Sequence, residues 1–287
     1  MADLWFRDVS NFALMPDDHQ AVYYKPLQEA SVALQPEVST SLYTDAKTVR
    51  IPTLEAEPEG TWTAEGSPIP TSTPTTSEVS VTPPKVAYLL PITRELLGDT
   101  GGEALFLAQT SMVRSLAKMV DRALFAPTAD GAEAPKGLRD LTDYQSVYVS
   151  DGFTDIDPFV TARALASSVG EQITAFVMNP MTALTLSTIK ESSMSNRPLL
   201  QPDVTVPGRK LIDGVPIIES PYVEEGTIWG IPKRAVISVI RTPAELGFNE
   251  AAGWGNYTVH ARLVQRLAWA FPHEEGIVKI IVGDESS

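Results

Sequence analysis

The chain has 287 residues, no cysteine, and 22 Lys and Arg against 36 Asp and Glu, which gives a formal net charge of −14. This length suits one large or two modest domains, and the negative charge would repel a phosphate backbone, so free-standing nucleic-acid binding is disfavoured. The missing cysteines exclude disulfides, thiolate zinc sites and cysteine nucleophiles, and no apolar run is long enough to span a membrane, so we expect a cytoplasmic origin.

The first 46 residues predict an extended arm. They mix apolar and acidic groups without sustained periodicity, and Pro16, Pro26 and Pro36 interrupt them. Only residues 19–34 could hold a short helix. We expect such an arm to be a poorly ordered terminus unless a neighbour holds it down.

Alternating residues predict a two-stranded ribbon after the arm. Residues 47–57 alternate in polarity, and residues 78–82 resume the alternation and continue through two prolines into residues 85–93. Prolines and threonines break the stretch between the strands. Because an isolated two-stranded ribbon is only marginally stable, two interpretations are open: a disordered linker, or a ribbon that lies on another subunit.

Residues 103–125 predict the longest helix of the chain. Apolar residues recur there at spacings of three and four, which is typical of a helix with one buried face. Arg114, Lys118 and Arg122 fall at i, i+4 and i+8, so they lie on one face, about 12 Å from first to last. This basic row is either a solvated charged face or a contact site.

The remaining residues predict a helix-and-strand block. We expect helices at residues 155–169 and from Asn179 to about Glu191, a buried strand at 174–178, and further strands at 210–213, 215–219, 226–231 and 235–240. Residues 257–271 and 276–282 predict closing strands that pair with each other and cover the long helix. Together these elements indicate one α/β module followed by a return to the helix.

Residues that could carry catalysis do not cluster in the sequence. No nucleophile elbow, P-loop, zinc-protease or dinucleotide-binding motif is present, and His19, His260 and His273 fall in three separate elements. The glutamates of the ribbon lie in a flexible segment, which cannot desolvate one carboxylate beside another. We therefore expect no enzyme activity, no catalytic or metal-binding residues, and no cofactor.

Six phrases follow one another in the order of these elements: Trp62–Gly66, Pro83–Asp99, Val120–Phe125, Val177–Pro180, Leu211–Ser220, and Arg262–Arg266 followed by Phe271 and Pro272. In that order and spacing the chain resembles a tailed-phage major capsid protein of the Hong Kong 97 type, from about residue 47 to residue 282. Each phrase alone is weak, because none is a catalytic signature.

The resemblance implies an α+β fold with five parts. These are an N-terminal arm (1–46), an extended loop formed by the ribbon (47–92), a peripheral domain with the spine helix (93–130), an axial α/β domain (131–240), and a return to the peripheral domain (241–287). It also implies a structural function, in which pentamers and hexamers of the chain close an icosahedral virion shell around double-stranded DNA in the host bacterial cytoplasm. Scaffolding would come from a separate protein, because only about 46 residues precede the ribbon, and portal and decoration proteins are possible partners.

The resemblance also suggests where subunits meet. Since the family's extended loop overlies a neighbouring subunit, we expect the acidic stretch of Glu55, Glu57, Glu59 and Glu65 to contact the basic row of that neighbour. Members that weld their shells use a lysine on this loop, whereas residues 55–80 contain none. Two alternatives remain: an encapsulin-like compartment that encloses cargo enzyme, which the fold alone does not separate from a phage head, and a soluble acidic hydrolase.

Overall fold

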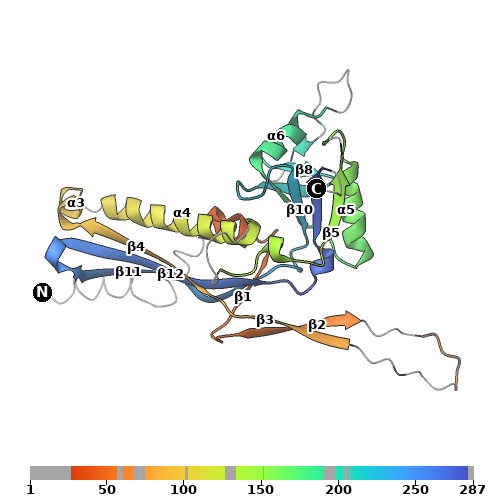
Figure 1. Ribbon diagram of the computed structural model, residues 1–287, viewed down its shortest axis with the longest axis horizontal. Helices are drawn as coiled ribbons and strands as arrows, with labels where there is room; N and C mark the ends of the chain where they lie inside the picture. Colours follow the sequence, from red (N-terminus) through yellow and green to blue (C-terminus); the bar gives the residue numbers. More distant parts are fainter. Residues whose placement is uncertain are drawn as a thin grey trace, which may run out of the picture.

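The computed structural model describes residues 27–56, 61–66, 71, 75–100, 103–126, 134–150, 152–190, 198, 200–202, 206 and 208–283. Figure 1 shows an elongated module built on one sheet, a compact module built on a second sheet, and a ribbon that projects from the elongated module. No helix of the described residues is long and apolar enough to cross a membrane.

The elongated module is a four-stranded sheet covered on one face by a long helix (Figure 1). Its strand order is β1 (Thr40–Tyr43), β11 (Ile237–Gly253), β12 (Thr258–Ala270) and β4 (Lys85–Thr93). The strand β1 runs parallel to β11, and the other neighbours are antiparallel. The short turn η3 (Trp254–Asn256) joins β11 to β12 at the far end of the module.

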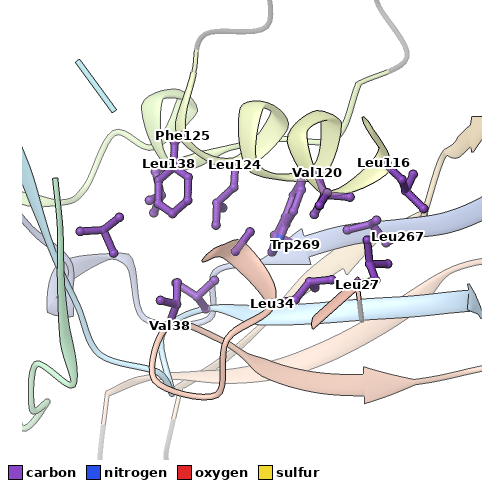
Figure 2. Packing of buried hydrophobic residues seen from close by; sticks show 14 of the residues in the cluster. Leu27, Leu34, Val38, Leu116, Val120, Leu124, Phe125, Leu138, Leu267 and Trp269 are labelled. Atoms are coloured by element: carbon purple, nitrogen blue, oxygen red, sulfur yellow. The ribbon is translucent and has the colours of Figure 1, made fainter. Parts of the chain in front are cut away.

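The long helix α4 (Glu103–Phe125) has the bounds that the sequence predicted, and the shorter α3 (Arg94–Asp99) precedes it. It buries one face against the sheet, and Figure 2 shows Leu116, Val120 and Leu124 directed toward Leu267 and Trp269 of β12. This packing explains the spacing of the apolar residues, because residues three and four apart share a helix face.

The second half of the predicted arm is part of this core. Residues 27–30 are helical, η1 (Val32–Leu34) follows, and Leu27, Leu34 and Val38 are fully buried under α4 (Figure 2). The expectation of a poorly ordered terminus is therefore wrong for residues 27–43. Residues 1–26 lie outside the described residues.

The compact module is a mixed seven-stranded sheet. Its strand order is β5 (Gln145–Val149), β13 (Val278–Val282), β10 (Thr227–Ile231), β6 (Ala175–Met178), β9 (Val215–Glu219), β8 (Lys210–Ile212) and β7 (Gln201–Pro202). The helices α5 (Asp157–Ser168) and α6 (Pro180–Thr188) pack against it. Every residue of β6 and β10 is buried, as expected for strands covered on both faces. The short turns η2 (Leu138–Asp140) and η4 (Glu274–Gly276) lie on the connections between the modules.

Five strand placements differ from the sequence predictions. The strand β11 lies in the four-stranded sheet, although we placed its first residues in the α/β module as a strand at 235–240, and β1 lies in the segment predicted as an arm. The strand β13 lies between β5 and β10 in the compact module, not with β12 over the long helix. The strand β4, which we assigned to the extended loop, pairs with β12 along its whole length, and β5 was not predicted. Alternation predicts that a strand exists, but its partner depends on contacts between residues that are far apart in the chain.

The ribbon consists of β2 (Val49–Ala56) and β3 (Thr75–Val81), which pair only with each other. Val49 and Ile51 lie opposite Val81 and Val79, so the ribbon has one apolar face. These four side chains are half-buried. At its base the ribbon touches β12, and Val79 and Val81 line a pocket together with Trp269 and Phe271.

Candidate inter-subunit contact surfaces

The basic row on α4 is exposed. Arg114, Lys118 and Arg122 all present their side chains to solvent on the same helix. Neither Arg114 nor Lys118 makes an ion pair with any described residue. Like charges four residues apart on a helix are mildly destabilising, so a negatively charged partner would relieve this repulsion.

The acidic stretch of the ribbon is described only in part. Glu65 is exposed, Glu55 belongs to β2 but its side chain is not described, and Glu57 and Glu59 lie outside the described residues. In the same chain the ribbon projects away from α4, on the other side of the four-stranded sheet (Figure 1). The structure therefore brings the three cations together and does not bring Glu65 to them within one chain.

The two faces of the ribbon differ in polarity. On the face opposite the valines, Arg50 forms an ion pair of 3.1 Å with Glu78, and the Thr48 and Thr82 hydroxyls are 2.9 Å apart. Cross-strand pairs of this kind keep the two strands in register. Since the polar side chains already pair with one another, the apolar face is the one whose burial against another surface would add stability.

The sheet of the elongated module carries a second basic surface, which the sequence analysis missed. Lys85 of β4 lies directly opposite Arg266 of β12, and Arg262 lies four residues before Arg266 on the same face. None of the three forms an ion pair with a described residue. Their juxtaposition depends on the register of two strands that are more than 160 residues apart, so no local pattern in the sequence could reveal it.

A buried carboxylate holds the arm segment against α4, and it was also missed. Asp121 is 5% exposed, and its Oδ1 accepts hydrogen bonds from the Ser31 hydroxyl at 2.7 Å and from the Ala33 backbone N–H at 2.9 Å. These bonds satisfy the start of η1 as a capping side chain would. An acidic residue on the apolar face of a predicted helix was the only sequence signal for this contact.

Burial raises the pKa of the Asp121 carboxyl, although the hydrogen bonds from Ala33 and Ser31 act in the opposite direction. A raised pKa means that the folded chain binds this proton more tightly than the unfolded chain does. The stability that depends on Asp121 should therefore be fully present below its unfolded pKa of about 3.9 and fall as pH rises through the folded pKa.

We predict that the free energy of unfolding of the wild type, relative to Asp121→Asn, decreases as pH rises from about 4 and then becomes constant. The asparagine retains an oxygen that can accept the same hydrogen bonds but has no proton to lose. Denaturant unfolding of the unassembled chain over this pH range measures the difference. A difference that increases with pH would contradict the role of burial at Asp121.

The described residues contain no group of three or more His, Asp or Glu side chains that could hold a metal ion. His260 lies on β12, His273 lies just before η4, and His19 is outside the described residues.

A sequence model of the phage capsid family matches residues 12–280. No curated protein matches the chain. The chain is similar in structure to a chain from Mycobacterium phage Adephagia, with a TM-score of 0.69 at 14% identity over 91% of each chain. It is also similar to the capsid of an empty GTA particle, with a TM-score of 0.68 at 14% identity over 86% of this chain and 89% of that one.

A more distant similarity is to the crystal structure of a virus-like particle from Pyrococcus furiosus, with a TM-score of 0.58 at 12% identity over 92% of this chain and 98% of that one. At these identities the structural similarities establish the fold. The family model, in contrast, matches nearly the whole chain in sequence.

Proposed function

Because the chain belongs to the phage capsid family, we propose that its copies form pentamers and hexamers and close an icosahedral head around double-stranded DNA. Membership of this family means that the chain is a structural protein of the virion and that many copies of it build the shell. The observation that carries the finer proposal is the ribbon, whose two strands pair with no other strand among the described residues and project from the elongated module (Figure 1). A second copy can supply the contacts that such a ribbon lacks in the free chain.

In this proposal the two modules take the two positions that the family's fold offers. The elongated module with α4 as its spine helix is the peripheral domain, and the compact module is the axial domain that packs around the five-fold and quasi-six-fold axes. The ribbon is the extended loop. This division differs from the sequence prediction by including β1, β4 and the whole of β11 in the peripheral domain and β13 in the axial domain.

The ribbon of one copy is proposed to place its acidic stretch on the basic row of a neighbour. Glu55, Glu57, Glu59 and Glu65 would face Arg114, Lys118 and Arg122 across the subunit boundary. The support is charge complementarity and the absence of an ion-pair partner for Arg114 and Lys118 among the described residues. Such contacts bring subunits into register more than they add affinity.

Further partners belong to the same proposal. A separate scaffolding protein, a portal and decoration proteins would act during assembly in the host bacterial cytoplasm. An encapsulin-like compartment is not favoured, because the family model is that of phage capsids and covers residues 12–280. Terminase, portal and tail genes beside the coding sequence would support the phage head, and a cargo-enzyme gene would support the compartment.

The charge of the chain leads to a test of DNA enclosure. A shell that packs DNA densely should not bind it tightly, and a subunit of charge −14 repels phosphates. We predict a net negative surface facing the lumen and no appreciable affinity of the purified chain for duplex DNA at physiological salt. Tight binding that weakens steeply with added salt would contradict this part of the proposal.

We also predict that mature particles contain no covalent links between subunits. Residues 55–80 contain no lysine, so the ribbon tip lacks an amine that could attack a neighbouring side chain. Boiled and reduced particles should run as a single band near 31.1 kDa in a denaturing gel. A ladder of covalent oligomers would show that another residue forms a link.

A further inference from the structure

Residues 31–39, which we call the strap, are bonded to both modules. They lie between the helical residues 27–30 and β1, at the point where the elongated and compact modules meet. The strap belongs to neither sheet. Its hydrogen bonds show what it connects.

One end of the strap is fixed to α4 of the elongated module. Asp121 accepts hydrogen bonds from Ser31 and Ala33, as described above, and Ser31 is fully buried. Leu34 and Val38 are also fully buried in the cluster beneath α4. This first anchor is therefore apolar as well as polar.

The other end of the strap is fixed to the compact module through Glu37. The Thr174 hydroxyl donates to the Glu37 carbonyl oxygen at 2.6 Å, and Arg209 Nη1 donates to Glu37 Oε1 at 3.0 Å. Thr174 immediately precedes β6, and Arg209 immediately precedes β8. One strap residue thus contacts the residues that lead into two separate strands of the compact sheet.

Between the anchors the strap is folded into a compact turn. The Ser39 hydroxyl donates to the Ala33 carbonyl at 2.7 Å, and the Val38 and Ser39 backbone N–H groups donate to the Gln35 carbonyl at 2.9 and 3.0 Å. These internal bonds give the strap a fixed length. A rotation of one module relative to the other would have to break an anchor or unfold this turn.

Immediately after the strap, Thr40 bonds to the connection between β10 and β11, where the chain passes from one module to the other. Its N–H donates to the Val236 carbonyl at 2.9 Å, and its hydroxyl donates to the Lys233 carbonyl at 3.0 Å. Thr174 also accepts a hydrogen bond from the Lys233 N–H at 2.9 Å. The strap therefore crosses the junction itself.

A cavity lies between part of the strap and the compact module. Its volume is about 410 Å³, with Val32 and Gln35 on the strap side and residues of α6, β8 and β9 on the other. The side-chain contact between Glu37 and Arg209 is polar and partly exposed, unlike the buried anchor on α4. Substitutions at this contact therefore leave the buried side chains of the strap in place.

We propose that the strap is a clamp of fixed length that sets the angle between the two modules, anchored on Asp121 at one end and on Thr174 and Arg209 at the other. This inference goes beyond the shell function and does not depend on it. The competing account is that the apolar cluster shared by the modules, which includes Phe125, Leu138 and Trp229, sets the angle alone.

Because the chain has no native cysteine, spin labels can be attached only to introduced cysteines, and the distance between two labels reports the angle between the modules. Nitroxide labels at Ser111→Cys on α4 and Ser167→Cys on α5, both exposed positions, report the distance between the modules by double electron–electron resonance. Labelled chain is diluted in a large excess of unlabelled chain to suppress distances between subunits. The distance distribution is compared among the wild type, Thr174→Val with Glu37→Ala, and Thr174→Ser.

We expect one narrow distance in the wild type and in Thr174→Ser, which keeps the hydroxyl, and a broader distribution with a shifted mean in the double variant. An insertion of two glycines between Pro36 and Glu37 should have the same effect, because it lengthens the strap while keeping every anchoring side chain. This insertion variant tests the proposal even if the double variant does not fold. Circular dichroism verifies folding. If the distribution stays narrow and unshifted in the folded variants, the apolar cluster alone sets the angle and the proposal is wrong.

Discussion

Reversing Arg114 and Lys118 to glutamate is expected to stop shells from closing, or to make them dissociate at lower salt than the wild type, while each subunit remains folded. Both side chains are exposed on α4 and are outside the core, so circular dichroism should not change. One exposed pair contributes only about 0.2–1 kcal/mol. The contact recurs in every subunit of a shell, so the loss accumulates over the particle.

The second basic surface provides a matched control for this prediction. Arg262→Glu with Arg266→Glu changes the charge by the same amount on the opposite side of the same module. Shells should survive this control, and Glu57→Lys with Glu59→Lys should restore assembly to the Arg114 and Lys118 reversal. Normal assembly of the variant with Arg114→Glu and Lys118→Glu would refute the pairing. If only the variant with Arg262→Glu and Arg266→Glu failed to assemble, the ribbon would contact the sheet surface and not α4.

Replacing Leu34 by alanine is expected to reduce the free energy of unfolding by about 2–5 kcal/mol, which is the usual cost of removing a buried leucine side chain. Leu34 is fully buried beneath α4, although it lies in the segment that the sequence suggested was an arm. Denaturant unfolding of the unassembled chain, followed by circular dichroism, measures the change.

Leu42→Ala is the control for Leu34→Ala, because Leu42 lies only eight residues later and is 38% exposed. Its loss should cost about 1 kcal/mol, since a partly exposed leucine loses less apolar burial. An effect of Leu34→Ala as small as that of Leu42→Ala would show that Leu34 does not belong to the core of the free subunit.

The sequence predicted those elements whose pattern is local. The bounds of α4 follow from its apolar spacing, and the ribbon follows from alternation on either side of a proline-rich stretch. The partners of the strands could not be predicted from such local patterns, because the positions of β4, β5 and β13 depend on pairings between distant residues. The burial of Leu34 was equally hidden, because Leu34 packs in one cluster with Leu116, Val120 and Leu124 of α4, which lie far away along the chain.

The same division holds for the contact surfaces. The basic row could be predicted because Arg114, Lys118 and Arg122 repeat at the helical period within one element. The basic face formed by Lys85, Arg262 and Arg266 could not, because it needs the register between β4 and β12. The strap was hidden for the same reason, because its anchors Asp121, Thr174 and Arg209 lie far from residues 31–39 along the chain.

The central claim is that this chain builds a closed shell, and negative-stain electron microscopy of the expressed full-length chain tests it most directly. The chain should be examined alone and after coexpression with its genomic neighbours, because a separate scaffolding protein is part of the proposal. We predict closed, icosahedral particles of uniform size that contain the chain as their main component. Isolated monomers or irregular aggregates in both preparations, from chain shown to be folded by circular dichroism, would contradict the claim.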